Sequence, residues 1–383
     1  MRSFANRTEG FEDSIFAVMS QKAAKHNAIN LSQGFPDFDG PEFIKKSASD
    51  YISKGFNQYA PFAGVPKLRA EISNVYSKWY DLSYNKDSEV TVVNGATEGI
   101  FATIQSLINP GDEVVVFEPV YDSYLSSIKL AGGIPVAVTL EGENFSYNQQ
   151  KLEEAFSHQT KLVIINSPHN PTGKVFTESE LKPIASLATK FDCFVLSDEV
   201  YEHLVYDDNK HIPFACLDGM KERTITISSA GKTFGLTGWK VGWCCANPEI
   251  TDRIRKIHQY ITFSIATPLQ LAVAEALRES KDYLQGFKET YQKKRDLFMN
   301  GLSKMGINFN APQGTYFIML PLKGITKLND VEFCEKLIVE HKVATIPPSA
   351  FYLNSEEGNH YLRICYAKSD DTLNKALENL QGL

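Results

Sequence analysis

The chain has 383 residues, which is too long for one ordinary hydrophobic core and long enough for two domains of unequal size. Hydrophobic residues make up 43% of it and charged residues 22%, and the formal net charge is −7 at pH 7. A mildly acidic chain has no basic field to attract nucleic acid. We therefore expect its partners to be small molecules or a second copy of the chain.

The cysteines and the apolar stretches point to a reducing compartment. Six cysteines occur, mostly in apolar surroundings and without C-x-x-C spacing, so we expect reduced thiols rather than disulfides or a metal site. The first 34 residues lack the apolar core of a signal peptide, and no run of 18 apolar residues occurs anywhere. We expect a cytoplasmic protein that does not bind a membrane.

From about residue 89 to 246, short apolar runs alternate with longer helical patterns. The runs are EVTVVNG, EVVVFEP, IPVAVTL, KLVIINSP, CFVLSDEV, TITISSA and KVGWCCA. Strands that are hydrophobic on both faces and separated by helices are typical of a buried, largely parallel sheet. The pattern predicts a three-layer α/β domain with a mostly parallel sheet of seven strands. Helices are expected over residues 99–107, 178–190 and 248–260, the second with a capping box formed by Thr177 and Glu180.

The last hundred residues change character. A charged helical stretch over residues 281–305 leads into INFNAPQGTYFIMLPL, then the helical DVEFCEKLIVEH, and finally VATIPPSAF and YLRICYA. This alternation predicts a smaller α+β unit. Because no flexible linker separates the two parts, we expect the boundary, near residue 275, to lie inside a helix.

Ligands of open α/β sheets bind beyond the carboxyl ends of the strands, so the residues after each run are informative. Asn170 follows KLVII in a proline-rich turn and can present an amide to a ligand, although it can also simply stabilise that turn. Asp198 ends the strand CFVLSD, where a buried carboxylate needs a partner such as a protonated ring nitrogen. The alternative is that Asp198 caps a helix. Tyr201 could point to the same side.

The stretch SSAGKTFGLTGWK follows the strand TITI and carries three glycines, each unfavourable in a helix interior. Lys232 stands there among small and apolar residues, which lower the pKa of an amine by desolvation and make it a nucleophile. Ser229 and Lys240 are suited to bind a phosphate, as are the backbone N–H groups of NGATEG. Read singly, Lys240 is as well explained as a solvated lysine and Gly95 as a plain turn.

The candidate residues complement one another. They offer an amine for an aldehyde, a carboxylate for a pyridinium, a phenol and an amide for a ring oxygen, and donors for a phosphate. Pyridoxal 5′-phosphate (PLP) carries all four groups on one ring, so we expect it as the cofactor.

The sequence resembles the class I and II aminotransferases of PLP fold type I nearly from end to end. The resemblance is carried by NLSQGFPDF, QYAPFAGVPKLR, NGATEG, PVYDSY, NSPHNPTG, SDEVYEHL, SSAGKTFGLTGWKVGW, GTYF and LRICYA. Among its branches, the chain looks most like the methionine aminotransferases and the kynurenine and glutamine transaminase K group. The resemblance implies a large PLP-binding domain over residues 41–274, and a small domain made of residues 1–40 together with 275–383.

The resemblance also implies roles for single residues. Lys232 is the Schiff-base lysine, Asp198 the pyridinium partner, and Asn170 and Tyr201 bind the 3-oxygen. Tyr121 stacks on the ring, and Arg363 clamps the substrate carboxylate with help from Gly34 and Asn170. Tyr59 reaches the phosphate in the other subunit of a homodimer. The remaining phosphate ligands are Ala96, Thr97, Ser229 and Lys240, the last of which stands where other members use arginine.

Donor preference is expected to favour neutral hydrophobic or sulfur-containing amino acids, with a 2-oxo acid as the acceptor in a ping-pong cycle. Dicarboxylate-specific relatives carry an extra arginine after the long helix, whereas this chain reads HQYITFSIATP there. Phe35, Tyr59, Tyr121 and Phe263 would instead surround an apolar side chain. The motif GKT is not a P-loop, because Thr226 replaces the required glycine, and NGATEG does not fit G-x-G-x-x-G. Cysteine-conjugate β-lyase activity and a non-catalytic binding protein of the same fold stay open.

Overall fold

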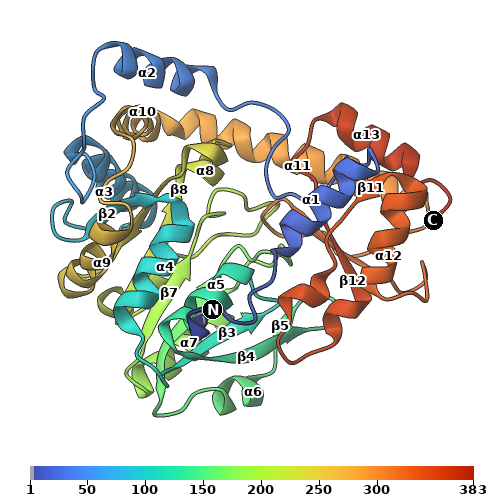
Figure 1. Ribbon diagram of the computed structural model, residues 1–383, viewed down its shortest axis with the longest axis horizontal. Coiled ribbons are helices and arrows are strands. Elements are labelled where there is room, and N and C mark those ends of the chain that lie inside the picture. Colours follow the sequence, from blue (N-terminus) through green and yellow to red (C-terminus); the bar gives the residue numbers. More distant parts are fainter. Residues whose placement is uncertain (1–3) are drawn as a thin grey trace.

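The computed structural model describes residues 4–383 and is built around one large twisted sheet (Figure 1). Its eight strands lie in the order β2-β9-β8-β7-β6-β3-β4-β5. Strands β8, β7, β6, β3 and β4 are parallel to one another, whereas β9 is antiparallel to β2 and β8. In chain order the strands are β2 (Val90–Asn94), β3 (Glu113–Glu118), β4 (Ile134–Glu141), β5 (Ser146–Tyr147), β6 (Thr160–Asn166), β7 (Phe194–Asp198), β8 (Thr224–Ser229) and β9 (Val241–Cys245).

All seven apolar runs of the sequence form strands of this sheet, which confirms the α/β fold class. The predicted number of strands was one too low, because β5 adds an eighth. Strand β5 has only two residues and pairs antiparallel with the end of β4. A two-residue strand has neither an apolar run nor an alternating pattern, so hydrophobicity alone gives no signal for it.

Both faces of the sheet are covered, as three layers require. Val114 and Val116 of β3 pack in one hydrophobic cluster with the helices α4 and α9, while Val115 and Phe117 pack in another with α7. A third cluster joins α2, α3 and α10 to β2 and β9. The helices are α1 (Ile15–Lys25), α2 (Glu42–Ser53), α3 (Pro66–Tyr80), α4 (Gly95–Leu107), α5 (Asp122–Ala131), α6 (Gln149–Glu154), α7 (Glu178–Lys190), α8 (Ala230–Thr233), α9 (Pro248–Ile261), α10 (Thr267–Arg278), α11 (Ser280–Lys304), α12 (Asp330–Lys336) and α13 (Asp370–Asn379).

Two helix starts show how local chemistry sets the boundaries. Helix α7 begins with the predicted capping box, in which Glu180 accepts the backbone N–H of Thr177 at 2.9 Å. Helix α4 begins four residues before the predicted start, directly after β2. There the carboxylate of Glu98 accepts the backbone N–H of Asn94 and satisfies a donor at the helix entrance. The early start was not predicted, because the glycines of NGATEG are unfavourable in a helix.

A separate core joins the two ends of the chain. Strands β10 (Phe317–Pro321) and β12 (Tyr361–Cys365) form an antiparallel pair, and β1 (Ile29–Asn30) pairs with β11 (Val343–Ala344). Met19 and Leu31 belong to the same cluster as residues of α11 and β12, and Figure 1 shows α1 beside β11. The division at residues 40 and 275 stays a prediction, although position 275 does lie inside α10. Within residues 4–383 no helix is both long and apolar enough to cross a membrane.

Candidate active site

A cavity of about 290 Å³ opens beside the carboxyl ends of β7 and β8. Its walls come from the loop after β1, the first turn of α4, the start of α5, the turn after β6 and strand β12. Tyr59 and Phe263, which were both expected around the substrate, do not line it. All of the other predicted site residues do: Gly34, Phe35, Ala96, Thr97, Tyr121, Asn170, Asp198, Tyr201, Ser229, Lys232, Lys240 and Arg363. The residues were expected at strand ends far apart in the sequence, and the fold brings them to one place.

Lys232 lies in the short helix α8, directly after β8. Its Nζ donates to the hydroxyl of Tyr316 at 2.8 Å and to the carbonyl oxygen of Gly34 at 3.2 Å. Desolvation lowers the pKa of Lys232 to about 8, and the nearby Arg363 and Lys240 also lower it. At pH 7 about a tenth of the amine is therefore unprotonated, far more than for an ordinary lysine, and this form is the nucleophile.

Asp198 is the last residue of β7 and is only 4% exposed. Its carboxylate accepts the hydroxyl of Tyr124 at 2.6 Å and the backbone N–H of Val200 at 3.3 Å. No helix follows, so Asp198 is not the helix cap that the sequence left as an alternative. Burial raises the pKa of Asp198 to about 6, and the hydrogen bond from Tyr124 opposes that rise. Within residues 4–383 the carboxylate has no cationic hydrogen-bond partner, which suits it to a cationic ligand.

Arg363 projects from β12 and is 1% exposed. One guanidinium nitrogen donates to the carbonyl oxygen of Ser32 at 2.5 Å and another to Asn170 Oδ1 at 3.3 Å. Its Nε is buried, and none of the described residues accepts a hydrogen bond from it. The guanidinium carbon lies 4.4 Å from the ring centroid of Phe317 and 4.8 Å from that of Phe16. A buried cation with an unused donor is a suitable binding group for a carboxylate.

At the start of α4 the cavity lining is positively charged, which suits it to an anion. Lys240 lies beside the start of α4, where a Cβ added at Gly95 would come within 3.0 Å of Lys240 Nζ. A helix N-terminus is itself positive, so a lysine there is unfavourable unless an anion lies between them. A Cβ at Gly242 would lie 2.8 Å from the backbone nitrogen of Ala96. Glycine at this position therefore lets β9 pack against the backbone at the start of α4, where a side chain would collide with it.

Three further predicted residues lie between these groups. Tyr121 is the residue before α5, and desolvation raises the pKa of its phenol to about 12. Tyr201 follows β7, and burial raises the pKa of its phenol too, so both phenols stay neutral hydrogen-bonding groups. Asn170 is fixed by its own backbone N–H, which donates to Asn166 Oδ1 at 2.7 Å.

Tyr59 lies outside the cavity. Its side chain is 85% exposed and makes an edge-to-face contact with Phe263, with ring centroids 5.5 Å apart. Within a single copy of the chain, Tyr59 therefore does not join the predicted phosphate ligands.

Comparison with known proteins identifies the family. The model of "Aminotransferase class I and II" matches residues 26–380. The chain belongs to this family. The chain is 41% identical to the methionine aminotransferase of Escherichia coli, over 96% of this chain and 95% of that protein. It is 42% identical to the kynurenine–oxoglutarate transaminase of Dictyostelium discoideum, over 99% and 96% of the two chains.

Solved aminotransferase structures have the same fold. An Escherichia coli protein described as having a methionine aminotransferase function superposes with a TM-score of 0.96 at 39% identity, covering all of both chains. The N-succinyldiaminopimelate aminotransferase of Mycobacterium tuberculosis superposes with a TM-score of 0.96 at 40% identity, covering 99% of each. The protein is therefore an aminotransferase of PLP fold type I, as its motifs implied.

The residues of this aminotransferase fit PLP. A desolvated amine, an unpaired buried carboxylate, two neutral phenols and a cationic helix entrance are the groups that its aldehyde, ring nitrogen, ring oxygen and phosphate require. Sequence reasoning missed Tyr124, Asn166 and Tyr316. Tyr124 and Tyr316 lie in the motifs PVYDSY and GTYF, but only the fold shows their contacts with Asp198 and Lys232.

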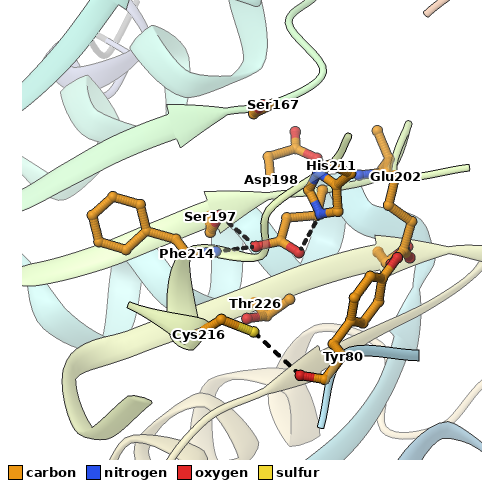
Figure 2. A network of polar contacts seen from close by, with 12 residues as sticks. Tyr80, Ser167, Ser197, Asp198, Glu202, His211, Phe214, Cys216 and Thr226 are labelled. Atoms are coloured by element: carbon orange, nitrogen blue, oxygen red, sulfur yellow. Dashed lines mark hydrogen bonds and ion pairs between the residues drawn. The ribbon is translucent and has the colours of Figure 1, made fainter. Parts of the chain in front are cut away.

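A buried polar network supports the cavity from behind (Figure 2). Glu199, which follows Asp198, accepts Ser197 Oγ at 2.7 Å and the backbone N–H of Phe214 at 3.1 Å, and lies 3.0 Å from His211 Nε2. Glu202, which follows Tyr201, accepts Ser228 Oγ at 2.6 Å and the hydroxyl of Tyr80 at 2.8 Å. The neighbours of the cavity residues in sequence therefore anchor the turn that carries them, and each carboxylate accepts at least two hydrogen bonds.

Proposed function

We propose that this aminotransferase binds PLP in the cavity, with Lys232 as the covalent attachment point. PLP supplies, when bound, an aldehyde that binds the substrate amine and a ring that accepts the electron pair of the broken Cα–H bond. Lys232 Nζ then holds and transfers the Cα proton as general base and acid. The Asp198 carboxylate holds a proton on the ring nitrogen, and the hydroxyl of Tyr124 orients that carboxylate. The observation that carries this proposal is that Lys232 and Asp198 line the same cavity. The pKa of Lys232 is lowered there and the pKa of Asp198 is raised.

The other residues bind and orient the two ligands. Asn170 and Tyr201 donate to the ring oxygen, and Tyr121 packs on the ring. Arg363 binds the substrate carboxylate, which supplies the acceptor that its buried Nε lacks. Gly34 and Asn170 contribute to the same subsite. The proposed phosphate ligands are Ala96, Thr97, Ser229 and Lys240.

We propose a neutral hydrophobic or sulfur-containing amino acid as donor, with methionine first and aromatic amino acids next. The cationic residues lining the cavity are Lys232, Lys240 and Arg363, and each already has a role. A second substrate carboxylate would lose its hydration without gaining a cation, at a cost of several kcal/mol. Phe16, Phe35 and Phe317 also line the cavity and can cover an apolar side chain, which gains roughly 1.5–3 kcal/mol on burial.

A panel of donors tests this preference at one fixed concentration of 2-oxo acid. We expect kcat/KM for methionine to exceed that for aspartate by more than about tenfold. Equal values, or a higher value for aspartate, refute the proposed donor class. Release of pyruvate and ammonia from a cysteine S-conjugate, measured beside the panel, would show the alternative β-lyase reaction.

We propose that the active form is a homodimer with shared sites. Large hydrophobic side chains are exposed together on the segments around residues 52–62 and 260–263, which a hydrogen bond of 2.6 Å from Thr267 Oγ1 to the carbonyl of Gln58 ties together. A second copy would cover them and bring Tyr59 to the phosphate of its partner. The exposed side chains are Ile52, Phe56, Tyr59, Phe62, Tyr260, Ile261 and Phe263.

A cytoplasmic location is proposed from the cysteines, because all six are free thiols and five of them are buried.

A further inference from the structure

In the part of the chain that the structure describes, Tyr316 is the one side chain that hydrogen-bonds Lys232. It stands just before β10 in the motif GTYF, is 2% exposed and does not line the cavity. Tyr316 therefore acts on the reaction through the cavity residues that it contacts, Lys232 and Tyr201.

The directions of the hydrogen bonds fix what Tyr316 offers to the lysine. Its hydroxyl donates to the carbonyl oxygen of Gly34 at 2.7 Å. A phenol has one hydrogen, so only an oxygen lone pair of Tyr316 remains for Lys232 Nζ at 2.8 Å. Gly34 O, at 3.2 Å from the same Nζ, is an acceptor as well. With the phenol hydrogen directed to Gly34, Lys232 donates to two acceptors.

A neutral amine has two N–H groups and one lone pair. When both N–H groups are directed to Tyr316 and Gly34, the remaining tetrahedral position on Nζ is the lone pair, and it is left for the cavity that Lys232 lines. In the ammonium form, the same position holds the third proton. We infer that Tyr316 is a positioning residue for Lys232: with the Gly34 carbonyl, it aims the reactive position of the free amine into the cavity.

Packing holds the Tyr316 hydroxyl in place. The ring stacks on Tyr291, with centroids 5.8 Å apart, and contacts the edges of Tyr201 at 5.2 Å and Phe317 at 4.8 Å. A Cβ at Gly34 would lie 2.9 Å from the Phe317 ring, so a larger residue at this position would require that ring to shift. The two acceptors come from opposite ends of the sequence and meet at α8.

Loss of the Tyr316 hydroxyl should change the titration of Lys232. A hydrogen bond to a charged donor is stronger than one to a neutral donor, so an acceptor stabilises the ammonium form more than the amine. Tyr316→Phe keeps the ring and removes the acceptor, so the pKa of Lys232 should fall. The titratable and charged groups that face Lys232 stay in place in this variant: Asp198, Tyr201, Lys240, Arg363 and Cys365.

The inference rests on the proposed role of Lys232. It is tested by measuring the pKa of Lys232 in the full-length apoprotein, without cofactor. Trace acetylation over a series of pH values, followed by mass spectrometry of the Lys232 peptide, gives the pKa of this amine. We expect about 8 for the wild type and a value roughly one unit lower for Tyr316→Phe, a tenfold change in the ammonium-to-amine ratio. Tyr291→Phe is the matched control, because it removes a hydroxyl from the stacked ring that does not contact Lys232, and its titration should equal that of the wild type.

An unchanged pKa in Tyr316→Phe, or an equal fall in Tyr291→Phe, overturns the inference. If Tyr316→Phe does not fold, a crystal structure of the wild-type apoprotein decides, and a separation of Nζ and the Tyr316 oxygen above about 4 Å overturns it. Borohydride reduction of the PLP-loaded wild type and mapping of the labelled peptide test the proposed function separately. A label on another lysine refutes the role of Lys232 but leaves the titration result unchanged.

Discussion

Replacement of Asp198 by asparagine should have opposite effects on the free protein and on the cofactor complex. Asparagine keeps an oxygen acceptor for Tyr124 and Val200, so the substitution mainly removes the negative charge. Burial raises the pKa of Asp198 from 3.8 to about 6. A raised carboxyl pKa in the folded state means that the ionised form destabilises the fold above pH 6, and that this cost vanishes below the unfolded pKa of 3.8.

The size of both effects follows from these values. A shift of about two units corresponds to roughly 3 kcal/mol, so apoprotein carrying Asp198→Asn should be as stable as the wild type at pH 7 or more stable by up to that amount. PLP binding should weaken about tenfold to hundredfold, because a charge-assisted hydrogen bond contributes roughly 1.5–3 kcal/mol. Turnover should fall by at least about a hundredfold, since an unprotonated ring accepts electrons poorly.

Thermal unfolding of the apoprotein at pH 7 and pH 4, together with a fluorescence titration of PLP, measures these effects. The exposed Asp192, which pairs with Arg223 at 3.2 Å, provides the control Asp192→Asn, which should change neither quantity. A less stable apoprotein with unchanged PLP affinity would refute the reasoning and give Asp198 a purely structural role.

Three other variants test separate parts of the account. Lys232→Ala should fold and bind PLP without covalent attachment but lose nearly all transamination. Turnover near that of the wild type would refute the assignment of Lys232 as the nucleophile and general base. Mixed Lys232→Ala and Tyr59→Phe subunits should recover part of the activity if sites are shared, whereas an active monomer in sedimentation at assay concentrations would exclude the dimer. Burial alone would raise the pKa of Glu275, but hydrogen bonds lower it to about 2, so Glu275→Gln should cost roughly 1–2 kcal/mol at pH 7 after allowance for solvent exposure. The donors to Glu275 are Ser47, Tyr51 and Lys67. Because the pKa of Glu275 is lowered, the loss of stability should shrink as the pH falls from 4.5 towards 2. A stability difference between wild type and Glu275→Gln that does not change with pH in urea unfolding would contradict this prediction.

The sequence predicted most of the large domain because its signals are local. Runs such as KLVII and TITI are hydrophobic on both faces, which only a buried strand requires, and each forms a strand of the sheet. The rule that ligands bind beyond strand ends then selected Asp198 and Lys232. Strand β5 was not predicted, because a strand of two residues is too short to show an alternating hydrophobic pattern.

The supporting contacts of the site could not be predicted, because they join distant segments. Tyr124 and Asp198 are 74 residues apart, and Tyr316 and Lys232 are 84 apart. Neither tyrosine differs in its local sequence from an ordinary core aromatic. Nor could the sequence decide whether Asp198 caps a helix, since the outcome depends on the turn that Glu199 and Glu202 anchor from behind.

The half-reaction with methionine in the absence of any 2-oxo acid tests the central claim most directly. The PLP-loaded protein should convert one equivalent of methionine per active site to 4-methylthio-2-oxobutanoate, retain the amino group, and release it to a 2-oxo acid added later. Lys232→Ala should form none on the same timescale. Formation of the oxo acid only when both substrates are present, or an equal yield from Lys232→Ala, would contradict the account.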